Sequence, residues 1–125
     1  MNAEELKHRT KQFGLGCIKI ARGLPRSTTA EVLGRQLIRS ATSVGANYRA
    51  ACRAHTRRHF IYKLAIVIEE ADESVFWLEM MTEADLLPDG AASGAKKEGE
   101  ELVAILTASS ITAKRNLALH KRESK

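Results

Sequence analysis

The chain has 125 residues, the usual length of one domain, and a formal net charge of +5. Gly and Pro are sparse, at 8 and 2 residues, whereas helix-favouring Ala, Leu, Glu, Lys and Arg are common. The longest apolar run, Leu64 to Ile68, cannot span a membrane, and the charged N-terminus has no apolar signal segment, so we expect a cytoplasmic protein with no membrane partner.

The first predicted helix covers residues 4–22. The residues of one face are spaced alternately four and three positions apart, which is typical of a helix packed on a core: Leu6, Thr10, Phe13, Cys17, Ile20 and Leu24. Gly23 ends this helix, and Ser27 or Thr28 can cap the next one. Thr28 and Glu31 also have the spacing of a capping box.

The second predicted helix, residues 29–54, separates an apolar face from a basic one. The apolar face consists of Leu33, Leu37, Ala41, Val44, Tyr48 and Ala51. Four arginines lie opposite, within about 80° of one another, and form a predicted nucleic-acid-binding ridge: Arg35, Arg39, Arg49 and Arg53. Between the two faces, Gly34 and Gly45 would let another helix backbone come close.

The third predicted helix, residues 57–86, begins after the capping residue Thr56 and is apolar on two sides. The side expected to face the core is Phe60, Leu64, Val67, Ala71, Ser74 and Leu78. A second seam runs along the far side: Tyr62, Ile66, Glu69, Glu73, Phe76, Trp77 and Met80. A helix that is apolar on both sides is normally buried on both sides, so we predict that this seam is an oligomer interface.

A turn at Leu87-Pro88-Asp89-Gly90, with Gly90 at positive φ, precedes the fourth predicted helix at residues 93–118. Its apolar side is Leu102, Ile105, Leu106, Ser109 and Ala113. The final residues, HKRESK, are interpreted as a frayed basic tail. Four helices with short connections predict an all-α fold, in which residues 1–125 form a single antiparallel, up-and-down four-helix bundle.

Charge is unevenly distributed along the chain. Residues 1–63 hold 13 Lys and Arg against 3 Asp and Glu, whereas residues 64–89 hold 8 acidic residues and no basic one. Residues 90–125 hold 7 basic and 4 acidic residues. A second predicted basic cluster lies at the start of the third helix: Arg57, Arg58 and Lys63. Either the acidic helix neutralises its basic neighbours, or the excess basic surface binds polyanions.

The sequence has no pattern that indicates catalysis, a metal or a cofactor. A di-iron bundle needs two Glu-x-x-His pairs, and only Glu5 and His8 form one. A turn expected at residues 54–57 disrupts a zinc-like spacing of Cys52, His55 and His59. Neither a Gly-x-Ser-x-Gly motif nor a Gly-rich phosphate loop occurs. We therefore expect a protein that is not an enzyme.

Two segments carry a resemblance to a known family. They are SVGANYRAACRA, residues 43–54, and EEADESVFWLE, residues 69–79, with Phe60 and Lys63 between them. Over residues 9–116 the chain resembles the four-helix-bundle family also called the 23S rRNA intervening-sequence proteins. One departure is the basic stretch before Phe60, where the family often has an acidic residue.

The resemblance implies an antiparallel four-helix bundle that assembles into ring-like homopentamers. The family includes the accessory variability proteins of diversity-generating retroelements, which are basic rings that bind nucleic acid and a reverse transcriptase. RNA or DNA and a reverse-transcriptase-like protein are therefore the implied partners, and no catalytic residue is implied. At the matching positions, Asn47 is expected to hydrogen-bond across to Glu70 or Glu73.

The leading hypothesis is a basic oligomeric scaffold that binds nucleic acid, RNA before DNA, through phosphate contacts that do not depend on base sequence. A pentamer would multiply the net charge of +5 fivefold. One alternative is a protein-interaction adaptor whose partner is an acidic protein or a polymerase-like enzyme. Another is a purely structural oligomer, whose arginines pair with Glu69 or Glu73 of the next subunit.

Overall fold

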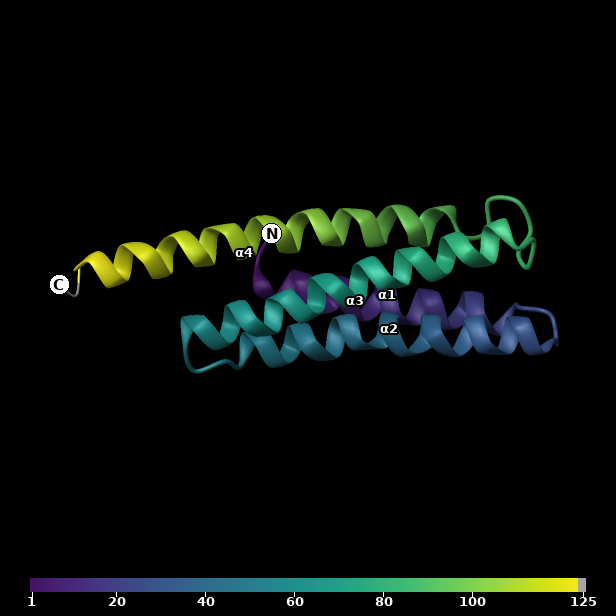
Figure 1. The fold of residues 1–125 in the computed structure, drawn as a ribbon, viewed down its shortest axis with the longest axis horizontal. Helices are drawn as coiled ribbons and strands as arrows, with labels where there is room; N and C mark the ends of the chain where they lie inside the picture. The colour runs from purple at the N-terminus through teal and green to yellow at the C-terminus, as the bar shows by residue number, and fades with distance from the viewer. Residues whose placement is uncertain (124–125) are drawn as a thin grey trace.

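Four α-helices account for most of residues 1–123, which are the residues that the computed structural model describes (Figure 1). They are α1 (Ala3–Arg22), α2 (Thr28–Cys52), α3 (Arg57–Glu83) and α4 (Ser93–Glu123). No residue in this range belongs to a β-strand, so the fold is all-α as predicted. Each helix begins within one residue of its predicted start, whereas three of the four predicted ends differ.

The helix starts are determined by polar side chains. The Ser27 hydroxyl accepts a hydrogen bond from the N–H of Ala30, and the Thr56 hydroxyl caps α3 in the same way. Both residues were predicted caps. The alternative capping box of Thr28 and Glu31 is wrong, because Ser27 occupies the N-cap position.

The predicted end of α3 at residue 86 is wrong, because the chain leaves the helix through a tight hydrogen-bonded turn. Asp85 adopts a positive φ of 58°, and the N–H of Leu86 reaches back to the carbonyl of Met81 at 3.0 Å. This pattern satisfies the last carbonyls of the helix. The predicted positive φ of Gly90 is confirmed, at 79°.

The predicted frayed tail is also wrong over residues 120–123, since α4 remains helical to Glu123. The last two residues of the predicted tail, 124–125, lie outside the described residues. Residues 114–123 contain neither Gly nor Pro. The last turn carries His120, Lys121 and Arg122, and positive charge is favourable at the negative end of the helix dipole.

Each helix packs antiparallel against the next one, and a shorter contact between α1 and α4 closes the bundle. Figure 1 shows the C-terminal part of α4 extending past the turn between α2 and α3. None of the four described helices has an apolar stretch of the length that a bilayer crossing requires.

The core consists mainly of the predicted apolar faces. Its largest fully buried side chains include leucines from three helices: Leu37, Leu64, Leu78, Leu102 and Leu106. On α4 the buried serine is Ser110, whereas the predicted core residue Ser109 is only half-buried. Cys17 is also buried, and burial raises the pKa of its thiol to about 12, so it stays protonated and unreactive.

Small residues bring α1 and α2 close together, as the glycines of the second helix predicted. A methyl group added at Gly45 would lie 3.4 Å from the backbone nitrogen of Lys11, and one at Gly14 would lie 3.3 Å from the Ala41 carbonyl oxygen. The most crowded glycine is Gly99 in α4, where an added methyl carbon would lie 2.7 Å from Val75 Cγ2. The bundle therefore uses glycine where helices meet.

Gly99→Ala is expected to lower the free energy of unfolding by about 1–2 kcal/mol, because overpacking outweighs the gain in helix propensity. Gly16→Ala is the matched control, since a methyl group there meets no atom within 4 Å. The control should raise stability by about 0.5–1 kcal/mol. Urea unfolding followed by circular dichroism compares them, and equal stabilisation by both substitutions would contradict the packing argument.

Candidate nucleic-acid interface

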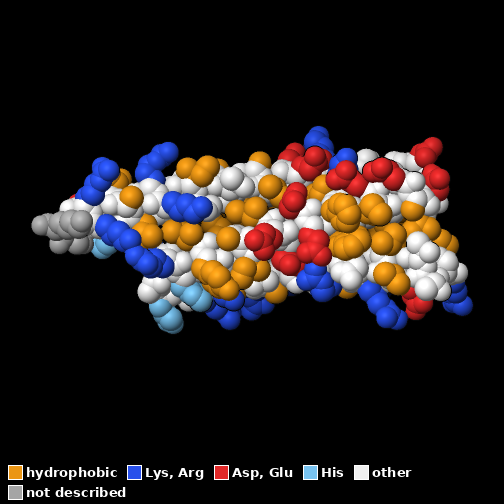
Figure 2. Space-filling model, in the orientation of Figure 1, with side chains coloured by type: hydrophobic (Ala, Val, Ile, Leu, Met, Phe, Trp, Pro, Cys, Tyr) orange, Lys and Arg blue, Asp and Glu red, His pale blue; other side chains and the backbone are white. Residues whose placement is uncertain are grey.

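Basic side chains gather at the end of the bundle where α2 turns into α3 (Figure 2). Residues 43–68 contain five Lys and Arg and no Asp or Glu, and residues 102–122 contain four and none. Antiparallel packing brings these two segments to one end. We define the basic end as Arg53, Arg57, Arg58, Lys63, Lys114, Arg115, Lys121 and Arg122.

A hydrogen bond joins the two segments of the basic end. The Arg57 guanidinium donates from Nη1 to the backbone carbonyl of Asn116 at 3.1 Å. This contact holds the first turn of α3 against α4. Beyond Asn116, α4 continues for about 10 Å, so its last cations project past the rest of the bundle.

The two helix ends at this surface differ in their electrostatics. Lys121 and Arg122 stabilise the C-terminus of α4, where the helix dipole is negative. Arg57 and Arg58 instead lie at the positive N-terminus of α3, whose first turn contains no acidic residue. Arg58 is exposed, and no carboxylate in residues 1–123 pairs with it. Helix stability accounts for the cations of α4 but not for Arg58.

The predicted arginine ridge of α2 is divided by Arg39. Its guanidinium donates to Glu70 of α3 at 3.2 Å and makes a short hydrogen bond to Glu73. Glu73 also accepts a hydrogen bond from the Trp77 indole N–H at 3.2 Å. The bond from Arg39, more than that from Trp77, holds the pKa of Glu73 below its ordinary value. The charge of Arg39 is therefore neutralised within the chain.

The other three ridge arginines lie in separate places. Arg35 is near the α1–α2 turn, at the opposite end of the bundle, 3.5 Å from Glu31. Arg49 lines a groove between α1 and α2, and only Arg53, the C-cap of α2, belongs to the basic end. The structure thus keeps the predicted cluster of Arg57, Arg58 and Lys63 together and disperses the ridge.

The predicted hydrogen bond from Asn47 to Glu70 or Glu73 is wrong. The Asn47 side-chain amide donates to the carbonyl of Ser43, one turn earlier in its own helix, at 2.9 Å. Both carboxylates are instead occupied by Arg39.

The second seam of α3 lies on the outside of the bundle, and we call it the α3 outer face. Tyr62, Phe76 and Met80 are 62%, 51% and 40% exposed, with Glu69 between them. Ile66 and Trp77 are half-buried, and the Trp77 ring meets that of Phe76 edge-on, with centroids 5.0 Å apart. The predicted interface residues therefore lie on one side of one helix, except that Glu73 is engaged by Arg39.

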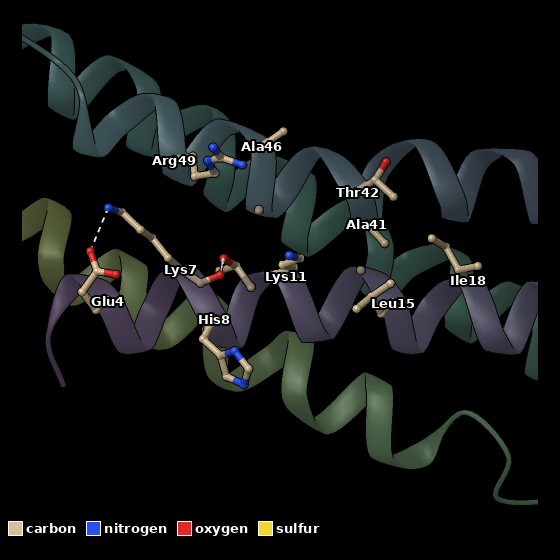
Figure 3. A pocket seen from close by; sticks show the side chains of 13 residues that line it. Glu4, Lys7, His8, Lys11, Leu15, Ile18, Ala41, Thr42, Ala46 and Arg49 are labelled. Carbon is tan, nitrogen blue, oxygen red and sulfur yellow. Dashed lines mark hydrogen bonds and ion pairs between the residues drawn. The ribbon is translucent and has the colours of Figure 1, made fainter.

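A groove of about 500 Å³ follows the contact between α1 and α2 (Figure 3). The close approach at Gly14 and Gly45 forms its floor. Figure 3 shows Leu15 and Ile18 along α1, and Lys7 extended toward Glu4, with which it forms an ion pair at 3.0 Å. We call this the α1–α2 groove. The sequence pattern did not predict this groove, although glycines inside both helices indicate a close helix contact.

The sequence pattern did not predict that the cations of α4 belong to the basic surface. Two of them, Lys114 and Arg115, lie in the predicted fourth helix, and Lys121 and Arg122 lie in the predicted tail. The available signal was the absence of acidic residues over 102–122, together with the absence of a helix breaker.

Comparisons with known proteins cover most of the chain. Residues 4–108 match the family described as 23S rRNA-intervening sequence protein. A solved structure from Bacteroides thetaiotaomicron VPI-5482, a protein of unknown function from the S23 ribosomal protein family, is similar with a TM-score of 0.78. The two are 28% identical, over 84% of this chain and 97% of that one. A search of curated proteins gave no match.

Arg39→Gln is expected to destabilise the protein at pH 7, by less than about 1 kcal/mol because half of the Arg39 side chain is exposed and solvent screens its two ion pairs. The ordinary pKa of Glu73 is 4.5, and Arg39 lowers it. The stabilisation is therefore present above pH 4.5 and is lost as pH falls through the lowered pKa. As pH falls from 7, the free energies of unfolding of the wild type and the variant should converge. A difference in free energy that grows in acid would refute this coupling.

Arg58→Glu is expected to raise the free energy of unfolding by about 0.5–1 kcal/mol, because it replaces a cation by an anion at the positive end of α3. Arg122→Glu makes the same charge change at the negative end of α4 and should lower stability. Thermal unfolding at low salt measures both. A loss of stability in the Arg58 variant would show that this arginine supports the fold.

Proposed function

Because the chain belongs to the 23S rRNA-intervening sequence protein family, we propose that it is a non-enzymatic, oligomeric scaffold that binds nucleic acid through the basic end. RNA is the first candidate and DNA the second. Binding depends on phosphates rather than on base sequence.

The observation that carries this proposal is the gathering of cations from two distant segments, residues 43–68 and 102–122, neither of which contains an Asp or Glu. The eight residues of the basic end come from the α2–α3 turn, the first turns of α3 and the C-terminal part of α4. A surface of this kind contacts several phosphates at once. Each neutralised phosphate releases a counterion, which makes such binding strong at low salt and independent of sequence.

Arg58 gives this proposal a specific support. It lies where the dipole of α3 already favours anions, so its charge opposes helix stability while adding to the attraction for phosphate. A residue that weakens the isolated fold and strengthens a binding surface fits a ligand contact better than a structural role.

Self-association is part of the same proposal. Several copies bound to one strand would hold it by multivalent contact, so that weak phosphate interactions add up. A pentamer is the assembly expected for the family. In the alternative of an adaptor, the basic end would dock an acidic protein such as a reverse-transcriptase-like partner, and in a structural oligomer it would bind no partner.

Fluorescence anisotropy with labelled single-stranded RNA, duplex RNA and DNA of mixed sequence tests the proposal. Affinity should fall steeply as salt rises from 50 to 200 mM, with a linear dependence of log K on log salt. Arg57→Glu with Arg58→Glu should reduce affinity by about tenfold or more and flatten this slope, because contacts to phosphate are lost.

Arg22→Glu with Arg26→Glu provides the matched control. It changes the net charge equally, but both residues lie at the opposite end of the bundle. If both double variants lost affinity equally, the effect would follow from net charge alone, and the basic end would not be the binding site. An absence of binding at 50 mM salt would contradict the nucleic-acid function and favour the adaptor or the structural oligomer.

A further inference from the structure

Two exposed apolar surfaces on this chain carry opposite charge. One is the α1–α2 groove, where Leu15 is 50% exposed. The other is the α3 outer face, where Phe76 is 51% exposed. Monomeric proteins rarely leave two such surfaces uncovered.

The α1–α2 groove is bordered by cations that are available for pairing. Lys11 and Arg49 line it, and neither forms an ion pair with any carboxylate of residues 1–123. Lys7, in contrast, is held by Glu4. The floor between these cations is apolar, with Leu15, Ile18 and the small residues of the helix contact.

The α3 outer face has the complementary composition. Glu69 is exposed between Tyr62 and Phe76, and within the described chain it makes no ion pair. Glu73 on the same face is already paired with Arg39. Glu69 is therefore an acidic group that remains available at the centre of this apolar face, and Asp72 at its border is also exposed and without an ion pair in the described residues.

Lys11 and Glu69 also lie at about the same height along the bundle. Ser40 and Ser74 share a buried hydrogen bond of 2.9 Å, which places these two residues level. Antiparallel helices rise equally per residue, so Gly45, five residues after Ser40, is about level with Glu69, five before Ser74. Gly45 in turn packs on the backbone of Lys11. Lys11 and Glu69 are thus about level, on opposite sides of the molecule.

These two surfaces cannot meet within one chain, because α1 and α3 are diagonal neighbours that do not pack on each other. We propose that the α1–α2 groove of one copy receives the α3 outer face of a second copy. Lys11 then pairs with Glu69, and Phe76 packs against Leu15 and Ile18. This inference rests on the oligomeric part of the proposed function and identifies the two surfaces that form its interface.

Charge decides between this arrangement and a symmetric one. A contact between two α3 outer faces centred on Glu69 would bring the two Glu69 carboxylates together, and a contact between two grooves centred on Lys11 would bring the Lys11 side chains together. A head-to-tail contact avoids both repulsions. Since the paired residues are level, successive copies are related by rotation without a shift along the bundle axis, which permits a closed ring.

Leu15→Asp and Phe76→Asp test the head-to-tail contact by sedimentation velocity without nucleic acid. Both residues are exposed, so unfolding curves of the variants should remain close to that of the wild type. Each variant has one intact and one blocked surface. We expect each to sediment as a monomer alone, while an equimolar mixture forms a one-to-one heterodimer and the wild type forms a larger oligomer.

Other outcomes would overturn the proposal. If Phe76→Asp dissociates the protein while Leu15→Asp does not, the α3 outer face pairs with itself. If neither variant changes a wild-type oligomer, other surfaces form it, and a monomeric wild type means that these faces bind a different partner.

A charge exchange gives an independent readout. Lys11→Glu and Glu69→Lys should each weaken assembly by about tenfold or more, and the double variant should recover most of it, because the pair is restored with reversed sign. Absence of recovery would refute the pairing of these two residues. RNA affinity of the monomeric variants is measured separately, so failure of the interface and failure of the basic end give different results.

Discussion

The register of α2 against α3 determines where the charges of this bundle lie. It is maintained by the buried hydrogen bond between Ser40 and Ser74, by the ion pairs from Arg39 to α3, and by the leucines packed between them. A shift by one helical turn would move each residue by about 5.4 Å. Arg39 would then lose its two carboxylates, and the acidic half of α3 would remain uncompensated.

Four acidic residues are neutralised by arginines of other helices within the chain. Arg39 pairs with Glu70 and Glu73, and on the other side Arg9 binds Glu98 and Glu101, both at 2.6 Å. Comparable pairs are absent from the basic end, as far as residues 1–123 show. The excess positive charge is therefore concentrated at one end, where it forms a local field that attracts polyanions.

The proposed interface and the proposed nucleic-acid surface are compatible because they occupy different parts of the bundle. The interface residues Lys11, Leu15, Glu69 and Phe76 lie along its sides, whereas the basic end surrounds the α2–α3 turn. In copies related by rotation about an axis parallel to the helices, all basic ends would lie on the same rim. Such a rim would present a continuous basic surface, and one strand could contact several subunits.

The sequence by itself determined the local features: the helix starts with their caps at Ser27 and Thr56, the positive φ of Gly90, and the apolar faces that form the core. These depend on side chains a few residues apart, so periodicity and capping chemistry suffice to predict them. Only the tertiary structure decided that Arg39 is neutralised, that Asn47 bonds within its own helix, and that α4 joins the basic end through Arg57 and Asn116. These outcomes depend on which turns of different helices lie level, and that follows from how the side chains of the whole core pack together.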